Sequence, residues 1–197
     1  MIQASHLPAK KRRRANIEFS IDDPVPKDHV GTEHLIIKAV VGKSLVHRIY
    51  VDNGSSANII YSHCLSKMPP EIQEFTRLPT SSVVGFAGQA VWPEGKISLP
   101  FTLVDYTGCR RKTVLADFIV IRATSQYNML LGRTGLWQLQ AIASTIHGLL
   151  KYLTNEGVEI IRSIPIEPIE FNVVSEPEES SRTWEKGESS NAMEVHV

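Results

Sequence analysis

The sequence has few cysteines, no excess of charge and no long apolar run. Cys64 and Cys109 are its only cysteines, and no Cys-x-x-Cys motif or cysteine–histidine cluster suggests a structural zinc site. No stretch approaches the roughly 18 apolar residues that a membrane helix requires, and the N-terminus has no apolar signal segment. These absences predict an intracellular, cytoplasmic protein with free thiols, no metal or other cofactor and no membrane partner.

Charge is balanced overall but unevenly distributed. Lys and Arg number 21, as do Asp and Glu, so the chain has no overall attraction for nucleic acid. Lys10–Arg14 is nevertheless a run of five cations. It could bind nucleic acid weakly, act as a nuclear-import signal or remain a solvated leader.

Three regions follow from the composition. Residues 1–32 are predicted to be a flexible basic leader, in which the alternation over 17–21 could add an edge strand. Residues 33–163 hold many short apolar runs between turn residues, which predicts an all-β domain with one or two short helices. Residues 164–197, rich in Glu, Ser and Pro, are predicted to be an acidic disordered tail.

Apolar periodicity predicts the strands of the domain. Residues 34–41 and 44–51 should form a hairpin. The alternation places four side chains of its second strand on one face: Leu45, His47, Ile49 and Val51. Residues 113–121 are almost entirely apolar, which predicts a strand buried on both faces, and Pro100 predicts an edge or a bulge in the strand at 96–103.

Two further local structures are expected from turn and capping residues. Residues 82–92 are predicted to form two strands joined at Ala87-Gly88, and residues 71–80 a loop. Thr134 is a suitable N-cap for a short helix that ends at Leu139.

One carboxylate lies at the end of a predicted strand. Asp52 precedes Asn53 and Gly54, whose lack of a side chain permits a tight turn. An ionised aspartate there is costly unless donors hold it, and Ser55 and Ser56 are short donors within reach. Asn-Gly between apolar runs is also a strong hairpin signal, so a plain hairpin is an alternative.

Three features in a fixed order then suggest a family. The run Val51–Ala57 is followed by a glycine-containing hairpin at 85–88, and then by Asn128–Arg133 before a short helix. Over residues 17–162 this order resembles the retropepsin-like aspartic proteases, and looks closest to the protease region of plant gypsy-type retrotransposon polyproteins. The resemblance implies a single-lobe acid-protease barrel.

The resemblance also implies roles for individual residues. Asp52 would be the catalytic aspartate, on an active-site loop with Asn53, Gly54 and Ser55. The flap over the substrate would consist of Gly85, Phe86, Ala87 and Gly88. The segment that supports the loop would consist of Asn128, Leu130, Leu131, Gly132 and Arg133.

Asn53 departs from the family pattern, which has Thr or Ser at this position. That hydroxyl bonds to the active loop of the second subunit. Asn also has a donor and an acceptor, but it is bulkier and needs more partners. Two functions therefore remain open: an active endopeptidase, and a degenerate domain used for dimerisation or protein binding.

The chemistry implied by the resemblance requires two carboxylates, and the chain offers one. Four other aspartates lack the glycine turn and the hydroxyl neighbours: Asp22, Asp23, Asp105 and Asp117. A homodimer would bring two copies of Asp52 together, with one as base toward water and the other as proton donor.

The expected substrate is an extended peptide bound by strand pairing. By resemblance it is the polyprotein of the element itself. The candidate pocket walls are Val84, Phe86 and Ile119.

Overall fold

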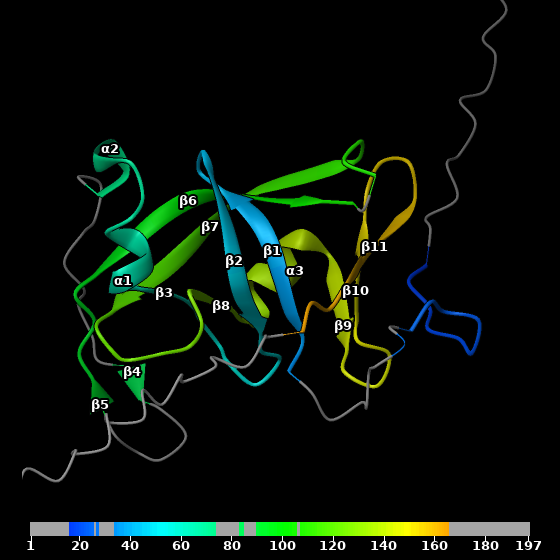
Figure 1. The fold of residues 1–197 in the computed structure, drawn as a ribbon, viewed down its shortest axis with the longest axis horizontal. Coiled ribbons are helices and arrows are strands. Elements are labelled where there is room, and N and C mark those ends of the chain that lie inside the picture. The colour runs from blue at the N-terminus through cyan, green and yellow to red at the C-terminus, as the bar shows by residue number, and fades with distance from the viewer. Residues whose placement is uncertain are drawn as a thin grey trace, which may run out of the picture. The chain divides into compact units, whose positions relative to one another are not determined.

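Six strands close into a barrel in the computed structural model, which describes residues 16–25, 27, 34–73, 83–84, 90–105 and 107–165. Their order around the barrel is β1-β2-β8-β3-β7-β6 (Figure 1). The strands are β1 Ile36–Val41, β2 Ser44–Val51, β3 Asn58–Tyr61, β6 Gly95–Val104, β7 Arg111–Ile121 and β8 Met129–Leu131. The all-β barrel expected from the sequence is confirmed.

The remaining elements are small. A three-stranded sheet, in the order β11-β10-β9, consists of β9 Ala141–Ser144, β10 Leu149–Leu153 and β11 Val158–Arg162. A separate pair consists of β4 Val83–Val84 and β5 Ala90–Val91, and the helices are α1 Ser62–Leu65, α2 Pro70–Gln73 and α3 Arg133–Leu139. No helix in the described part of the chain has the length and apolar content of a membrane span.

The barrel core follows from alternation along its two longest strands. Phe101 of β6 and Phe118 of β7 are fully buried, with ring centroids 6.0 Å apart. Leu115 of β7, in contrast, is 64% exposed. The prediction that residues 113–121 are buried on both faces is therefore wrong, because this strand alternates between the barrel interior and its outer surface.

A β-bulge in β2 reverses the face predicted for its first half. Two residues of β2 lie opposite one residue of β1, and Arg48 in this bulge has a φ of 53°. Ile49 is buried as expected, but Leu45 is 57% exposed while its neighbour Val46 is buried. One extra residue shifts the alternation, so the predicted shared face is wrong for Leu45 and His47.

Pro100 lies in a strand of the barrel wall. Its missing N–H costs no hydrogen bond to β7 at this position. It pairs with Leu115 of β7, and its carbonyl accepts a hydrogen bond of 2.7 Å from Gly42 N in the β1–β2 turn. The amide and carbonyl of one strand residue point to the same side, so β7 loses no donor at this position. Pro100 lies beside the end of β1, and the expected bulge or free edge is not found there.

The hairpin expected over 82–92 is present as β4 and β5, in which Val83 pairs with Val91. Its tip lies outside the described residues. The loop expected at 71–80 begins instead with the short helix α2, which Pro70 can start because the first helical turn needs no N–H there.

Residues 16–25 pack on the C-terminal sheet through side chains and do not form the expected edge strand at 17–21. Lys151 of β10 donates 2.6 Å to Glu18 O, pairs with Asp23, and lies 4.7 Å from the Phe19 ring centroid. A turn closed by Asp23 N and Ser20 O, at 3.1 Å, uses backbone groups that a ladder would need. The strand prediction over 17–21 is thus wrong.

We expect Asp23→Asn to lower the melting temperature by several degrees. The Lys151 and Asp23 side chains are only 7% and 9% exposed, so the substitution leaves a buried ammonium without its counter-charge. Lys151 lowers the pKa of Asp23, so this stabilisation is present at neutral pH and is lost as the pH falls through the lowered value. Circular dichroism melts at neutral and strongly acidic pH measure both effects.

The double variant Asp23→Asn/Lys151→Met is the control, since it removes both charges. It should melt close to the wild type. A double variant that melts as low as Asp23→Asn would contradict the pairing.

Candidate functional site

β8 lies between β2 and β3, which excludes a hairpin at Asn53-Gly54. β2 pairs with β8 in parallel, and β3 pairs with β8 in antiparallel orientation. The two strands that flank the Asp52 loop therefore contact a third strand instead of each other (Figure 1). The plain-hairpin alternative is wrong.

Backbone groups hold Asp52 on this loop. Its N–H donates to Leu131 O at 3.0 Å, and its carboxylate Oδ1 accepts from Gly54 N at 2.8 Å. Ser55 N adds a contact of 3.3 Å to Asp52 O. The Asp52 side chain is partly exposed at the end of a fixed strand, where a second molecule can reach it.

The hydroxyl of Ser55 does not bond to Asp52. It donates to Ala57 O at 2.8 Å and accepts from Ala57 N at 3.3 Å. Ser55 therefore closes its own turn through the backbone of Ala57. The expectation that this hydroxyl supports Asp52 is wrong.

Gly132 and Arg133 lie directly against the active-site loop. A Cβ atom on Gly132 would lie 2.3 Å from Ala57 O, so only glycine permits this approach. Arg133 N donates to Ser55 O at 2.9 Å, and its Nη1 donates to Gly54 O at 3.0 Å. The loop therefore rests on the start of α3.

Asn128 supports the site from the other side by holding the β2 bulge. Its Nδ2 donates to His47 O at 2.8 Å and its N to Arg48 O at 3.0 Å. The bulge interrupts the regular pairing of β1 and β2, so these two carbonyls need other donors. Asn128 supplies them. Leu130 and Leu131 of β8 are buried beneath the active-site loop.

Asn58 is a residue that the sequence analysis missed. It is 1% exposed, and its Oδ1 accepts from Gly132 N at 2.9 Å and from Gly135 N at 3.2 Å. Its Nδ2 donates to Asp117 O at 2.9 Å. The signal was an asparagine on the inward-facing side of a predicted strand, where an apolar residue would be usual.

This arrangement also explains how α3 begins. The helix starts at Arg133 with Gly132 as N-cap and no capping side chain of its own, so the predicted Thr134 cap is wrong. Asn58 supplies the acceptor for the helix amides from a distant strand, and Gly135 leaves room for it, since a Cβ there would lie 2.6 Å from Asn58 Oδ1.

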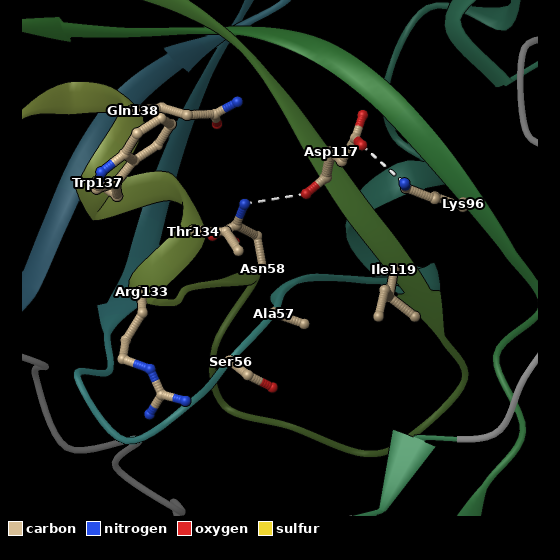
Figure 2. A pocket seen from close by; sticks show the side chains of 10 residues that line it. All are labelled: Ser56, Ala57, Asn58, Lys96, Asp117, Ile119, Arg133, Thr134, Trp137 and Gln138. Carbon is tan, nitrogen blue, oxygen red and sulfur yellow. Dashed lines mark hydrogen bonds and ion pairs between the residues drawn. The ribbon is translucent and has the colours of Figure 1, made fainter.

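A pocket of about 620 Å³ extends from the active-site loop across the outer face of β7 (Figure 2). Ser56 and Ala57 line the end next to the loop, and Ile119 lines the wall. The far end holds a charged pair, Lys96 and Asp117, 2.7 Å apart. The remaining lining residues are Asn58, Arg133, Thr134, Trp137 and Gln138.

Other aspartates are engaged in structural bonds. Asp117 binds Lys96 and accepts 2.5 Å from Ser98 Oγ, and these two partners lower its pKa. Asp105 accepts from the Thr107 hydroxyl and from Arg110 N, and its pKa is also lowered. The expectation that these two lack hydroxyl neighbours is wrong; the bond described for the Asp52 carboxylate comes from a loop backbone amide instead.

Three rings lie beside the Asp52 strand. Tyr127 stacks on Tyr50 at 5.1 Å between centroids, and His34 Nδ1 hydrogen-bonds the Tyr127 hydroxyl. Burial raises the pKa of Tyr50, and the negative charge of Asp52 raises it further. No sequence pattern indicated this cluster, because its members are far apart along the chain.

The flap residues Gly85, Phe86, Ala87 and Gly88 lie outside the described residues, as does the side chain of Val84. Their predicted roles stay predictions. Among the residues that the structure describes, no group of three or more His, Cys, Asp or Glu side chains could hold a metal ion.

Comparison with known proteins finds likeness in structure only. No protein-family model matches the chain, and no curated protein does. The retroviral protease-like domain of Ddi1 from Leishmania major is 16% identical, with a TM-score of 0.45 over 66% of this chain and 94% of that one. EIAV protease in complex with the inhibitor HBY-793 is 13% identical, with a TM-score of 0.40 over 57% and 93%.

A retropepsin-like aspartic protease from Rickettsia conorii is 17% identical, with a TM-score of 0.34 over 65% of this chain and 89% of that one. At such identities the likeness concerns the fold alone and carries no inference on activity.

We expect Gly132→Ala to lower the free energy of unfolding by about 2–3 kcal/mol, as overpacking does. The added methyl would meet backbone atoms of Ala57, which cannot rotate away. Urea unfolding measures the loss. Gly108→Ala is the control: its φ is 77° but nothing lies within 4 Å, so about 1 kcal/mol of backbone strain is expected. Equal losses in the two variants would contradict the close approach.

Asn58→Ala should cost about 2–4 kcal/mol, because it leaves several buried polar groups without partners. Asn58→Asp keeps the size and the acceptor but places a negative charge near Asp117 O. This variant should therefore be less stable at neutral than at acidic pH. Urea titrations at the two pH values measure the difference. If Asn58→Ala were as stable as the wild type, the Asn58 side-chain amide would not bind these groups.

Proposed function

We propose that this protein is an aspartic endopeptidase that acts as a homodimer, with one Asp52 from each subunit. The observation that carries the proposal is Asp52 itself: a carboxylate on a loop held by hydrogen bonds, bonded by Gly54 N–H, a few residues before Ser56 and Ala57, which line a pocket. The order of motifs resembling retropepsin-like proteases supports the same function.

The loop is built to hold that carboxylate still. The backbone of Gly54 and Ser55 is bonded to Arg133, and Gly132 lies against Ala57. Rigid support of this kind lowers the cost of organising reacting groups, because the carboxylate need not be ordered during the reaction.

Two copies of Asp52 about 3 Å apart across a two-fold axis could not both ionise, so they would share one proton. The ionised carboxylate would take a proton from a bound water as the water attacks the peptide carbonyl carbon. The protonated one would donate to the carbonyl oxygen. A tetrahedral intermediate forms and then expels the amine after proton transfer.

The proposed substrate is an extended peptide that lies in the pocket beside Ser56, Ala57 and Ile119. Main-chain pairing would supply affinity, and side-chain pockets would supply selectivity. The resemblance to plant gypsy-type elements leads us to propose a retrotransposon polyprotein as the natural source of that peptide.

A degenerate dimerisation or protein-binding domain is the second candidate, and Asn53 favours it. The Asn53 side chain is exposed beside Asp52. Arg133 bonds the backbone carbonyl of Asn53, and that bond does not use the side-chain amide. An amide at this position would have to find its partners in the second subunit.

We expect cleavage of a polyprotein-derived peptide at mildly acidic pH that pepstatin inhibits and that Asp52→Asn abolishes. Adding an equal amount of Asp52→Asn protein should reduce wild-type activity to about half, since mixed dimers hold one defective carboxylate. Independent monomers would keep full activity in the mixture.

Activity that Asp52→Asn retains would refute the aspartic mechanism. A wild type that is inactive but becomes active as Asn53→Thr would instead support the degenerate domain.

A further inference from the structure

Three segments of the chain meet at the carboxylate of Glu94. Its Oε2 accepts a hydrogen bond from Ser62 Oγ at the start of α1, and its Oε1 pairs with Arg122 Nε at 2.5 Å, just after β7. The Glu94 N–H donates to Val120 O at 2.8 Å. The Glu94 side chain is 33% exposed and the Arg122 side chain 83%, so water screens the ion pair strongly and the part-buried bond to Ser62 less.

Glu94 lies where the β4–β5 hairpin joins the barrel. In the described part of the chain, β4 and β5 form a sheet of two strands apart from the barrel. β5 ends at Val91, Pro93 is buried, and β6 begins at Gly95. The bonds of Glu94 therefore determine how this end of the hairpin leaves the barrel.

The segment 122–128 is held at both ends, at the first by Glu94 and at the last by separate contacts with residues 61 and 63. Its first residue, Arg122, is held through Glu94 to Ser62, and at its last, Asn128 Oδ1 lies 3.2 Å from His63 Nε2. Tyr61 N also donates to Asn128 O at 3.2 Å. The consecutive residues 61–63 thus hold the segment that carries Tyr127, the ring stacked beside the Asp52 strand.

We propose that Glu94 is a positioning residue of the site: its carboxylate couples the base of the β4–β5 hairpin to the segment 122–128. The inference rests on the proposed function for its effect on catalysis, while the coupling itself is a property of the fold. Glu94 does not touch Asp52 and takes no part in the chemical step.

The charge state of Glu94 suits an acidic working range. The Ser62 hydroxyl, and next the Arg122 guanidinium that faces it, hold the pKa of Glu94 below its ordinary value. The contact is therefore present at mildly acidic pH and is lost only as the pH falls through the lowered value.

Amide hydrogen exchange on the full-length protein tests the coupling without need of activity. In Glu94→Gln, exchange in segments 90–95 and 122–128 should both accelerate about tenfold, as expected for one lost charge-assisted bond. Ser62→Ala removes one of the two side-chain partners and should give a smaller increase. The amides of β10 serve as an internal reference for global unfolding.

Glu156→Gln is the matched control, since it removes a carboxylate that pairs with Arg110 at 3.0 Å in the β10–β11 turn. It should leave both segments unchanged. Exchange that accelerates only at 90–95 in Glu94→Gln, or that rises equally in Glu156→Gln, would overturn the coupling.

Peptide cleavage gives the second measurement. Glu94→Gln should raise KM several-fold with little change in kcat, and Glu94→Asp should restore KM in part. A fall in kcat with unchanged KM would overturn the positioning role. A wild type without any cleavage would refute the proposed function, and the exchange result would still decide the coupling.

Discussion

The close approach of two backbones, at Gly132 and Ala57, is the constraint on which the site depends. It leaves no room for a side chain, and it allows Arg133 to bond the carbonyls of the active-site loop. The approach is possible because β8 lies between β2 and β3 and delivers Gly132 beneath the loop. A loop of small residues is thereby held by backbone contacts.

Polar groups inside this arrangement differ in whether side chains or the backbone hold them. Asn58 is buried with three partners, and Asn128 supplies donors to the carbonyls of the β2 bulge. Asp23, Asp105 and Asp117 each have a side-chain partner that lowers the pKa. Asp52 is held by a backbone amide instead, which leaves its carboxylate available to another molecule.

Local patterns predicted most strands because each strand buries every second side chain. The strands β1, β2, β6 and β7 begin and end within two residues of their predicted bounds. Failures occurred where an interaction from elsewhere intervened. The β2 bulge moved Leu45 to the surface, the turn at Ser20–Asp23 replaced an edge strand, and Asn58 capped α3 in place of Thr134.

The sequence by itself determined the apolar alternation of the barrel, the single Asp-x-Gly turn and the Asn128–Arg133 segment, since each depends on residues close along the chain. Only the tertiary structure decided that β8 separates the strands around Asp52, that Asn58 joins α3 to β7, and that Glu94 links two distant segments. These depend on which strands become neighbours, and hydrophobic periodicity specifies the face that a strand buries but not the strand beside which it lies.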